Sequence, residues 1–287
     1  MARVACSPLS WGSVLVETFL DEAADAGYAG IELSEATLDQ HAKQPARLHH
    51  LLEERQLALA AAPFTGSFFE RDLRKEELER LRRRADTIVE LEGRGVVSFR
   101  TVRHPARRDM IAGEPPLLPL TNDRFAALAD TLNQLCDVCR DFGLTGALAN
   151  RVGTFVETPD EFMAVVDRTE PELVKLAPDL GHWAYAGGDP VALVRAQRDR
   201  LAYLHLKDFD SRVFDAIREE RLGFRHFLRD GGFKPLGEGA QDLEAALMPL
   251  ERAEYAGWVG VELEVSDRPP KETAQISRDY LRTTLHW

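Results

Sequence analysis

The sequence has few cysteines, no excess of positive charge and no long apolar run. Its 287 residues include three cysteines, Cys6, Cys136 and Cys139, which do not make a disulfide framework and are typical of a reducing cytoplasm. The formal charge of −12 makes nonspecific attraction to nucleic acid or to an anionic membrane unfavourable. No stretch reaches the ~18 apolar residues of a membrane span. We therefore expect a cytoplasmic protein without nucleic-acid or membrane partners.

Signals for targeting, linkers and phosphate loops are also missing. The first residues, Met1-Ala2-Arg3-Val4-Ala5-Cys6, lack the basic-then-apolar order of a signal segment. No Pro/Gly/Ser-rich linker divides the chain, so we expect one domain over residues 1–287. No glycine-rich phosphate loop is evident, which favours an unphosphorylated substrate. Cys136-Asp137-Val138-Cys139 lies in a helical pattern without a second pair, and this indicates helix packing rather than a redox or zinc site.

Short apolar runs alternate with amphipathic helical patterns along the chain. The predicted strands are Arg3–Cys6, Gly30–Leu33, Leu57–Ala61, Val96–Phe99, Leu144–Leu148, Leu173–Leu176, Leu201–Leu206 and Trp258–Leu263. The predicted helices are Trp11–Ala26, Leu38–Arg55, Arg71–Glu92, Asn122–Phe142, Pro159–Arg168, Pro190–Arg198, Leu243–Ala256 and Pro270–Thr284. Parallel strands need crossovers of about a dozen residues or more, which these helices supply. The pattern predicts an α/β fold, a single-domain (β/α)8 TIM barrel.

Three of the predicted strands end in residues of the types that commonly bind metals. Asp179, His205 and Glu262 lie near the ends of successive strands in the second half of the chain. Carboxylate and imidazole ligands suit one divalent cation, such as Mn, Co, Zn, Fe or Mg. The carboxyl ends of barrel strands form one face, where active sites lie. We therefore expect these side chains to meet.

Strand alternation adds further polar groups to this face. It puts Tyr203, His205 and Lys207 on one side of their strand, and Glu262 and Glu264 on one side of theirs. A lone strand histidine is more often a hydrogen-bonded core residue, but a His and a Lys on the same face favour function. A buried carboxylate without a cation is unfavourable, and a shared metal removes that cost.

A weak internal repeat supports the barrel. The segment Ala26–Glu35 resembles Ala253–Glu264, because both read as a helix end, a turn and a strand that ends in Glu-Leu followed by a further Glu. Two longer connections stand out, residues 101–121 and 209–239, and either could cover a pocket. Within the second, Arg212–Phe233 reads as a lid or as an ordinary surface helix. The charged Arg71–Arg84 stretch reads as a solvated helix face.

Taken together, these motifs resemble the xylose-isomerase-like TIM barrels, and within them the inosose (2-keto-myo-inositol) dehydratases and related sugar isomerases and epimerases. The likeness spans most of the chain and is most specific in the second half. The segments that carry it are Ala5–Trp11, Gly27–Leu33, Val152–Thr158, Asp179–His182, Ala186–Pro190, His205–Asp208, Phe233–Gly239 and Gly257–Glu262.

The resemblance implies a divalent metal held by Glu, Asp, His and Glu. Asp179, His205 and Glu262 match three of these ligands. The fourth position departs from the family, because the chain has Ala149-Asn150-Arg151 where relatives carry a Glu or a His-x-His pair. Glu157 is the nearest substitute, and its alternative role is to lead into the helix at Pro159. Without Glu157, the site has three protein ligands and water.

The family chemistry assigns roles to several other residues. A cation that bridges a carbonyl and a neighbouring hydroxyl stabilises an enediolate, and a carboxylate removes the α-proton. Glu157 or Glu262 is the expected base, while Lys207 and His182 are expected to polarise oxygen or deliver a proton. The residues expected to bind substrate are Glu32, Arg100, Arg151, Trp183, Asp208 and Glu264.

Isomerisation, epimerisation and dehydration of a sugar or cyclitol ketone all use this pocket, and we rank them in that order on family frequency. β-Elimination on a 3-keto-glycoside is a further possibility within the family. A nuclease resembling endonuclease IV would need more metal ligands and a basic track. A metal-free carbohydrate-binding barrel is the non-enzyme alternative, and it is favoured by Ala149. Trp287 at the chain terminus is compatible with a homo-oligomer interface.

Overall fold

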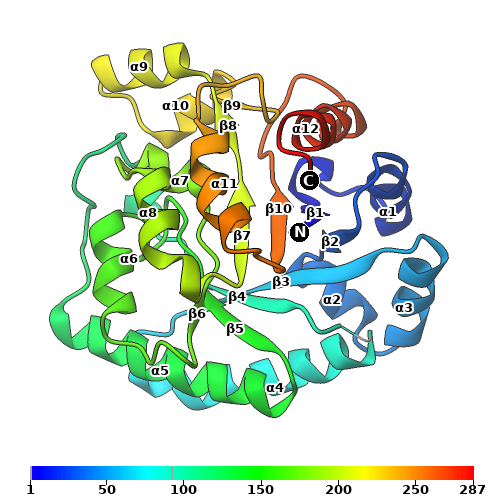
Figure 1. Cartoon of the computed structure of the whole chain (residues 1–287). Coiled ribbons are helices and arrows are strands. Elements are labelled where there is room, and N and C mark those ends of the chain that lie inside the picture. The colour runs from blue at the N-terminus through cyan, green and yellow to red at the C-terminus, as the bar shows by residue number, and fades with distance from the viewer. Residues whose placement is uncertain (1, 92) are drawn as a thin grey trace.

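The computed structural model describes residues 2–91 and 93–287. Met1, the first residue of the predicted domain, and Glu92, the predicted end of one helix, lie outside this part. Eight parallel strands form the central sheet, and helices surround it (Figure 1). These strands are β1 (Arg3–Cys6), β2 (Gly30–Glu32), β3 (Ala58–Gly66), β4 (Val96–Thr101), β5 (Thr145–Leu148), β6 (Lys175–Leu176), β7 (Tyr203–Leu206) and β10 (Trp258–Val261). All eight overlap the predicted strands.

The sheet closes into a barrel. Its strand order is β6-β5-β4-β3-β2-β1-β10-β7, and two single bridges, Leu176↔Leu201 and Asp179↔His205, join the β6 and β7 sides. The second bridge places Asp179 directly beside His205, and the His205 amide donates to the Pro178 carbonyl at 2.9 Å. The predicted TIM barrel is therefore confirmed, and its closure helps to assemble the strand ends.

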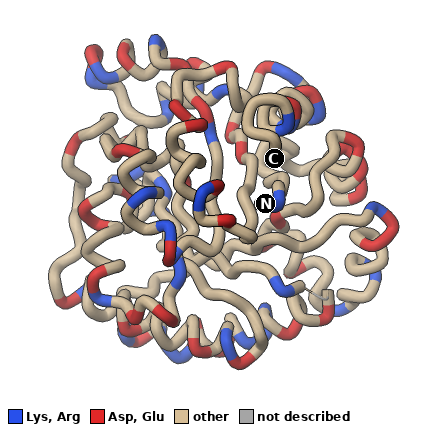
Figure 2. The backbone as a smooth tube through the Cα atoms, viewed as in Figure 1, with Lys and Arg blue, Asp and Glu red and all other residues tan. Residues whose placement is uncertain are grey.

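The helices form the outer layer. Within the described residues they are α1 (Val16–Asp25), α2 (Glu35–His41), α3 (Pro45–Glu54), α4 (Arg74–Glu90), α5 (Asn122–Asp141), α6 (Pro159–Val166), α7 (Leu180–Tyr185), α8 (Pro190–Gln197), α9 (Ser211–Glu219), α10 (Phe224–Arg229), α11 (Leu243–Arg252) and α12 (Pro270–Thr284). Acidic and basic residues are interspersed along this layer (Figure 2). No helix of the described part is long and apolar enough to cross a membrane.

The prediction of one helix over Leu38–Arg55 is wrong. Two helices, α2 and α3, occupy this stretch and meet at Pro45, the first residue of α3. Proline lacks an amide donor and disfavours helical geometry at the residue before it. Gln44 accordingly has φ −144° and ψ 58°, which breaks the helix. A capping box precedes Pro159, with Thr158 and Glu161 bonded reciprocally.

Small side chains fill much of the barrel interior. Its buried cluster combines alanines from several strands with Tyr203 and Trp258. Gly260 lets Tyr203 pack closely, because a Cβ at Gly260 would lie 2.0 Å from the Tyr203 hydroxyl. Ala149 belongs to the same buried cluster. The interior is thus a packed core below the polar strand ends.

A second layer covers one side of the barrel mouth. The connection after β7 forms a small hairpin, β8 (Asp208–Phe209) with β9 (Phe233–Lys234), and carries α9 and α10 (Figure 1). Phe224 and Phe227 of α10 are buried against Tyr185. The segment Arg212–Phe233 therefore packs, through a shared apolar cluster, against residues such as Met110 and Tyr185 of other elements.

Candidate active site

Glu32, His205 and Glu262 converge at the carboxyl ends of β2, β7 and β10. All are buried, and one ligand atom from each lies within 4.8 Å of the others. His205 Nε2 lies 3.2 Å from Glu32 Oε1 and 3.9 Å from Glu262 Oε2. Ser7 Oγ donates to Glu262 Oε2 at 3.1 Å. This group matches the donors that divalent cations prefer.

Lys207 joins Asp179 to the same group. Its ammonium nitrogen lies 2.5 Å from Asp179 Oδ2 and also contacts Glu262 Oε1. Burial opposes the charge on Lys207, but the two carboxylates outweigh it and raise the pKa of the lysine. Burial likewise would raise the pKa of Asp179 and of Glu262, yet Lys207 leaves both pKa values below their usual range. The three groups are therefore charged at neutral pH.

Asn150 fixes the position of Asp179. Its side-chain oxygen accepts from the Asp179 amide at 2.8 Å, and its side-chain nitrogen donates to the Asp179 carbonyl at 3.3 Å. Asp179 also caps α7 by accepting from the His182 amide at 3.0 Å. The sequence predicts no role for Asn150, because no sequence pattern identifies a side-chain amide that bonds to the backbone.

Arg151 points into the cluster and holds two carboxylates. It donates to Glu264 Oε1 at 2.8 Å and to Glu262 Oε1 at 3.4 Å. His182 Nε2 lies 2.7 Å from the same Glu264 oxygen. Burial lowers the pKa of His182, and the nearby carboxylates only partly oppose it. Burial would raise the pKa of Glu264, but Arg151 and His182 hold it far below its usual range.

Arg100 contacts Glu32 and His205 in the group of candidate ligands. Its Nη2 lies 3.4 Å from Glu32 Oε1 and 3.1 Å from His205 Nε2. Burial would raise the pKa of Glu32, but His205 and Arg100 outweigh it and lower the pKa. Glu32 thus lies among the candidate ligands, whereas the sequence analysis placed it among the substrate-binding residues.

Glu157 lies apart from these groups. Its Oε1 accepts from Arg107 Nη2 at 2.8 Å, and its Oε2 accepts from the Gly153 amide at 2.7 Å. Burial raises the pKa of Glu157 to about 7, although Arg107 opposes the shift. Among the described residues, neither group of possible ligands includes Glu157. The geometry gives it a role in holding the loop after β5.

Trp183 and Asp208 also have contacts outside the cluster. Trp183 packs edge-on against Phe162 and donates to the Asp189 carbonyl at 3.2 Å. Asp208 accepts backbone N–H bonds from the loop after β9, including those of Gly237 and Gly239 at 3.0 Å. Of the twelve residues expected from sequence, the structure brings the following together: Glu32, Arg100, Arg151, Asp179, His182, His205, Lys207, Glu262 and Glu264.

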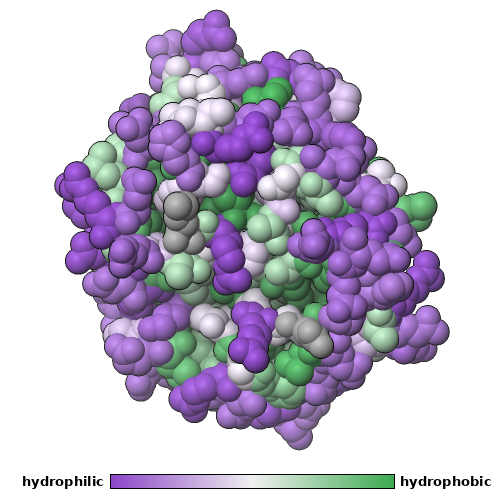
Figure 3. All heavy atoms as spheres, turned by 45° about the vertical axis from the view of Figure 1, so that its right-hand side comes forward, coloured by the Kyte–Doolittle hydropathy of each residue, from purple (hydrophilic) through white to green (hydrophobic). Residues whose placement is uncertain are grey.

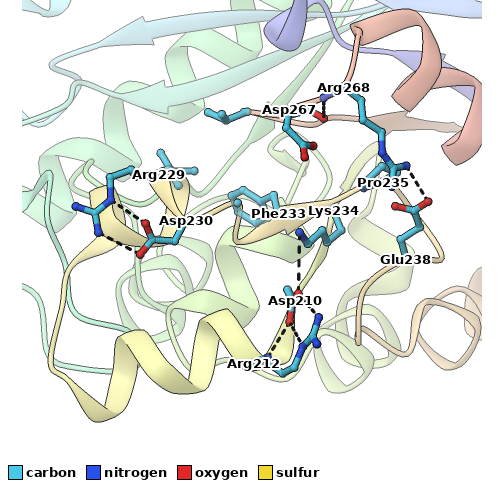
Figure 4. A pocket seen from close by; sticks show the side chains of 14 residues that line it. Asp210, Arg212, Arg229, Asp230, Phe233, Lys234, Pro235, Glu238, Asp267 and Arg268 are labelled. Carbon is cyan, nitrogen blue, oxygen red and sulfur yellow. Dashed lines mark hydrogen bonds and ion pairs between the residues drawn. The ribbon is translucent and has the colours of Figure 1, made fainter.

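Two hollows lie near the strand ends. The larger, about 580 Å³, lies beside the β8–β9 hairpin, and its charges pair with one another, as Arg229 does with Asp230 and Arg268 with Glu238 (Figure 4). The smaller, about 220 Å³, is lined by Ser7, Glu32, Arg100 and Glu262 among others. The candidate ligands Glu32 and Glu262 therefore meet solvent in the smaller hollow, which we call the ligand cavity.

The buried ion pairs of Arg107 are expected to stabilise the folded protein. Arg107 pairs with Glu157 at 2.8 Å and with Glu161 at 2.7 Å, and its side chain is fully buried. Removing one partner of a buried ion pair costs about 3–5 kcal/mol. For Arg107→Met we expect a loss of about 3 kcal/mol in urea unfolding, because Glu157, with its raised pKa, can take up a proton.

The matched control is Arg124→Met, which breaks an exposed pair with Glu70. Exposed pairs contribute at most about 1 kcal/mol. Equal losses in the two variants would contradict a structural role for the buried arginine.

Comparison with known proteins agrees with the barrel fold described above. A model of the xylose isomerase-like TIM barrel family matches residues 20–284. Inosose dehydratase from Geobacillus kaustophilus is 27% identical, over 99% of this chain and 95% of that protein. The rhizopine catabolism protein MocC from Rhizobium meliloti is 32% identical, over 91% of this chain and 81% of that protein.

Solved structures share the fold. The probable 3-DHS dehydratase AsbF of Bacillus anthracis superposes with a TM-score of 0.75 at 14% identity, covering 98% of this chain and 99% of that chain. The 3-keto-D-glucoside 4-epimerase YcjR of E. coli gives 0.71 at 18% identity, covering 99% and 100%. With the family match over nearly the whole sequence, these likenesses lead to one conclusion: the chain belongs to the xylose isomerase-like TIM barrel family.

Proposed function

We propose that this chain is a divalent-metal-dependent lyase that dehydrates a cyclitol or sugar ketone. The observation that carries the proposal is the convergence of Glu32, His205 and Glu262 beside a cavity that Glu32 and Glu262 line. Buried carboxylates gathered at one point are unfavourable unless cations balance them, and here three cations, Arg100, Arg151 and Lys207, face four carboxylates. A metal-free binding barrel gives no reason to gather acids and an imidazole at this point.

The donor set fits a metal ion. Glu32, His205 and Glu262 offer two carboxylates and an imidazole within 4.8 Å of one another, a combination suited to Mn, Co, Zn, Fe or Mg. Asp179, His182 and Glu262 form a second group of the same kind, but Lys207 already bridges Asp179 and Glu262. We therefore assign the ion to the first group. Of the four ligands expected from sequence, His205 and Glu262 are kept, Glu32 takes the place of Glu157, and Asp179 instead pairs with Lys207. Such a cation polarises a carbonyl and its neighbouring hydroxyl, which makes the α-proton easier to remove.

The residues around the cavity have separate roles in the proposed reaction. Glu262 lines the cavity and is held in place by contacts with Lys207, Arg151 and Ser7, so it is our candidate acceptor for the α-proton. Arg100 lines the same cavity and can donate to an oxygen that gains negative charge. Lys207 and His182 lie behind this surface and keep the carboxylates in place.

Dehydration leads because of the curated relatives. The sequence analysis ranked isomerisation and epimerisation first on family frequency. The relatives named inosose dehydratase cover nearly the whole chain at 26–28% identity, whereas the epimerase structure, at 18% identity, supports the fold alone. Isomerase or epimerase activity remains the second candidate, since the same proton removal begins both reactions.

One experiment separates these functions. The protein is incubated with 2-keto-myo-inositol and MnCl2 in D2O, and the products are followed by mass spectrometry. We expect loss of one water from the substrate. Deuterium incorporation without loss of water would instead indicate an isomerase or epimerase. No change in mass with Mn, Co, Zn, Fe or Mg, for this ketone and for ketose sugars, would favour the binding barrel.

Metal binding has its own test. We expect about one divalent ion per chain by elemental analysis after loading, and loss of the ion in His205→Ala because one of three ligands is removed. His50→Ala is the matched control, since His50 is exposed on α3 and pairs with the exposed Glu54. Equal metal content in the two variants would remove His205 from the ligand set.

A further inference from the structure

The ligand cavity contains few groups that can carry a proton. Much of its lining is apolar and includes Leu9, Val14, Val16 and Phe19. Hydrophobic side chains also lie in recesses between hydrophilic ones on the face of the molecule shown in Figure 3. A reaction that moves protons inside the cavity therefore depends on a small number of polar side chains.

A dehydration in this cavity needs a proton donor as well as a proton acceptor. Glu262 is the proposed acceptor of the α-proton. The β-hydroxyl must then receive a proton to depart as water, because hydroxide is a poor leaving group at neutral pH. The donor has to reach the ring of the bound ketone, so it must lie at the cavity surface.

Ser7 both contacts Glu262 and lines the cavity. The register of β1 with β10 places Cys6 opposite Val261, so the next residues, Ser7 and Glu262, are neighbours at the two strand ends. The Ser7 amide donates to the Val261 carbonyl at 3.0 Å, and the Ser7 hydroxyl donates to Glu262 Oε2 at 3.1 Å. Both side chains are buried and line the cavity. The pairing of two strands therefore holds this hydroxyl against the proposed base.

The other hydroxyl and N–H groups of the cavity lining are bonded elsewhere. Ser34 and Thr37 bond each other through their hydroxyls at 2.8 Å, and Ser34 Oγ also accepts from the Thr37 amide at 3.1 Å. Trp11 Nε1 donates to Glu22 Oε2 at 2.7 Å. These groups do not contact the proposed base.

The charged groups near the cavity are also unsuited to donate a proton. Arg100 lines the cavity, but a guanidinium does not give up its proton in a protein. Glu32 is a proposed metal ligand and so carries no proton. Lys207 is fully buried against two carboxylates and is not among the residues that line the cavity. Within the described part of the lining, Ser7 is therefore the proton carrier that contacts Glu262.

The position of this hydroxyl beside the base suits the shape of the ketone. In 2-keto-myo-inositol every hydroxyl is equatorial, so the α-hydrogen and the hydroxyl on the next carbon lie on the same face of the ring. A base and an acid that are hydrogen-bonded to each other can therefore act on both groups from one side. A hydroxyl can also donate one proton while it accepts another.

We propose that Ser7 is a catalytic residue that returns the α-proton to the departing hydroxyl. Glu262 takes the proton as the α-C–H bond breaks, and the electron pair of that bond forms the new C=C bond as the β-C–O bond breaks. The departing oxygen keeps the C–O electron pair and takes the Ser7 hydroxyl proton, while Ser7 takes the proton from Glu262. One water leaves, and both side chains regain their starting state. The inference rests on the proposed function, because it takes Glu262 as the base.

Two events measured in one experiment test this role. The protein is incubated with 2-keto-myo-inositol and MnCl2 in D2O, and mass spectrometry follows both the loss of water and the deuterium gained by the remaining ketone, relative to a sample without protein. For Ser7→Ala we expect water loss to slow by about 10²-fold or more, as for removal of a positioned acid. Deuterium incorporation should continue, because Glu262 is kept.

Two further variants serve as controls. Ser7→Thr keeps a hydroxyl and should retain most of the water loss. Ser13→Ala changes an exposed serine outside the cavity lining and should match the wild type. Urea unfolding and metal content, measured on every variant, should also match the wild type, so that neither unfolding nor loss of metal explains the effect of Ser7→Ala.

The possible failures of the inference and of the proposed function are distinguishable. Unchanged water loss in Ser7→Ala would place the donor elsewhere, and an equal fall in water loss and deuterium incorporation would show that Ser7 only positions Glu262. Either result overturns the inference and leaves the dehydratase in place. Wild-type protein that incorporates deuterium without losing water, or that does neither, would overturn the dehydratase and the inference together.

Discussion

Glu262→Gln is expected to lower kcat/KM on the ketone substrate by about 10²–10⁴-fold, the range attributed to a positioned acid or base. Glutamine keeps the size of the side chain but removes its charge. Glu262 belongs to both groups of possible ligands, and it contacts Lys207 and Arg151. The substitution therefore weakens metal binding and removes the proposed proton acceptor together.

Two measurements are needed to interpret the effect of Glu262→Gln. Steady-state kinetics give the loss of activity, and elemental analysis of the same sample gives the metal content. Glu244→Gln, at an exposed position of α11, is the control and should match the wild type in both. Full metal content and unchanged kcat/KM in Glu262→Gln would exclude Glu262 from the site.

The barrel could be predicted because its signals are local. Each predicted strand combines β-branched or apolar residues with a following helical pattern, and all eight occur. Because parallel strand ends share one face of the barrel, Asp179, His205 and Glu262 could also be expected to meet. The Asp179↔His205 bridge brings the first two together, and the pairing of β7 with β10 brings Glu262 beside them.

The role of Glu32 was present in the sequence but was interpreted differently. The repeat that pairs Ile31-Glu32-Leu33 with Val261-Glu262-Leu263 puts two glutamates at equivalent strand ends. In a closed barrel, β2 and β10 both flank β1, so equivalent ends point to the same centre. The repeat therefore contained the evidence for Glu32 as a candidate ligand.

The surroundings of Glu157 could not be derived in this way. Its main partner, Arg107, comes from the long connection after β4, 50 positions away in the sequence. No periodicity or capping rule relates two such residues, and only the tertiary fold brings them together. The same holds for Asn150, whose side chain binds the backbone of Asp179.

Lys207→Met is expected to cost about 5 kcal/mol of unfolding free energy at neutral pH, the upper end for removal of one partner from a buried ion pair. The Lys207 side chain is fully buried between Asp179 and Glu262. Methionine fills a similar volume but leaves two buried carboxylates beside each other without this cation. The loss is measured by urea unfolding in the presence of EDTA, so that bound metal does not compensate.

The pH dependence of the loss follows from the pKa shifts. Asp179 and Glu262 have lowered pKa values in the folded protein, so their stabilisation is present above the ordinary values of 3.8 and 4.5 and disappears as the pH falls through the folded values. The difference between wild type and Lys207→Met should therefore shrink as the pH falls below about 4. Toward alkaline pH it should persist beyond 10.5, because the pKa of Lys207 is raised above that value.

Lys75→Met, whose lysine is 90% exposed, should lose less than about 1 kcal/mol at every pH. A loss in Lys207→Met that does not change between pH 7 and pH 3 would show that packing, rather than charge, is what Lys207 contributes.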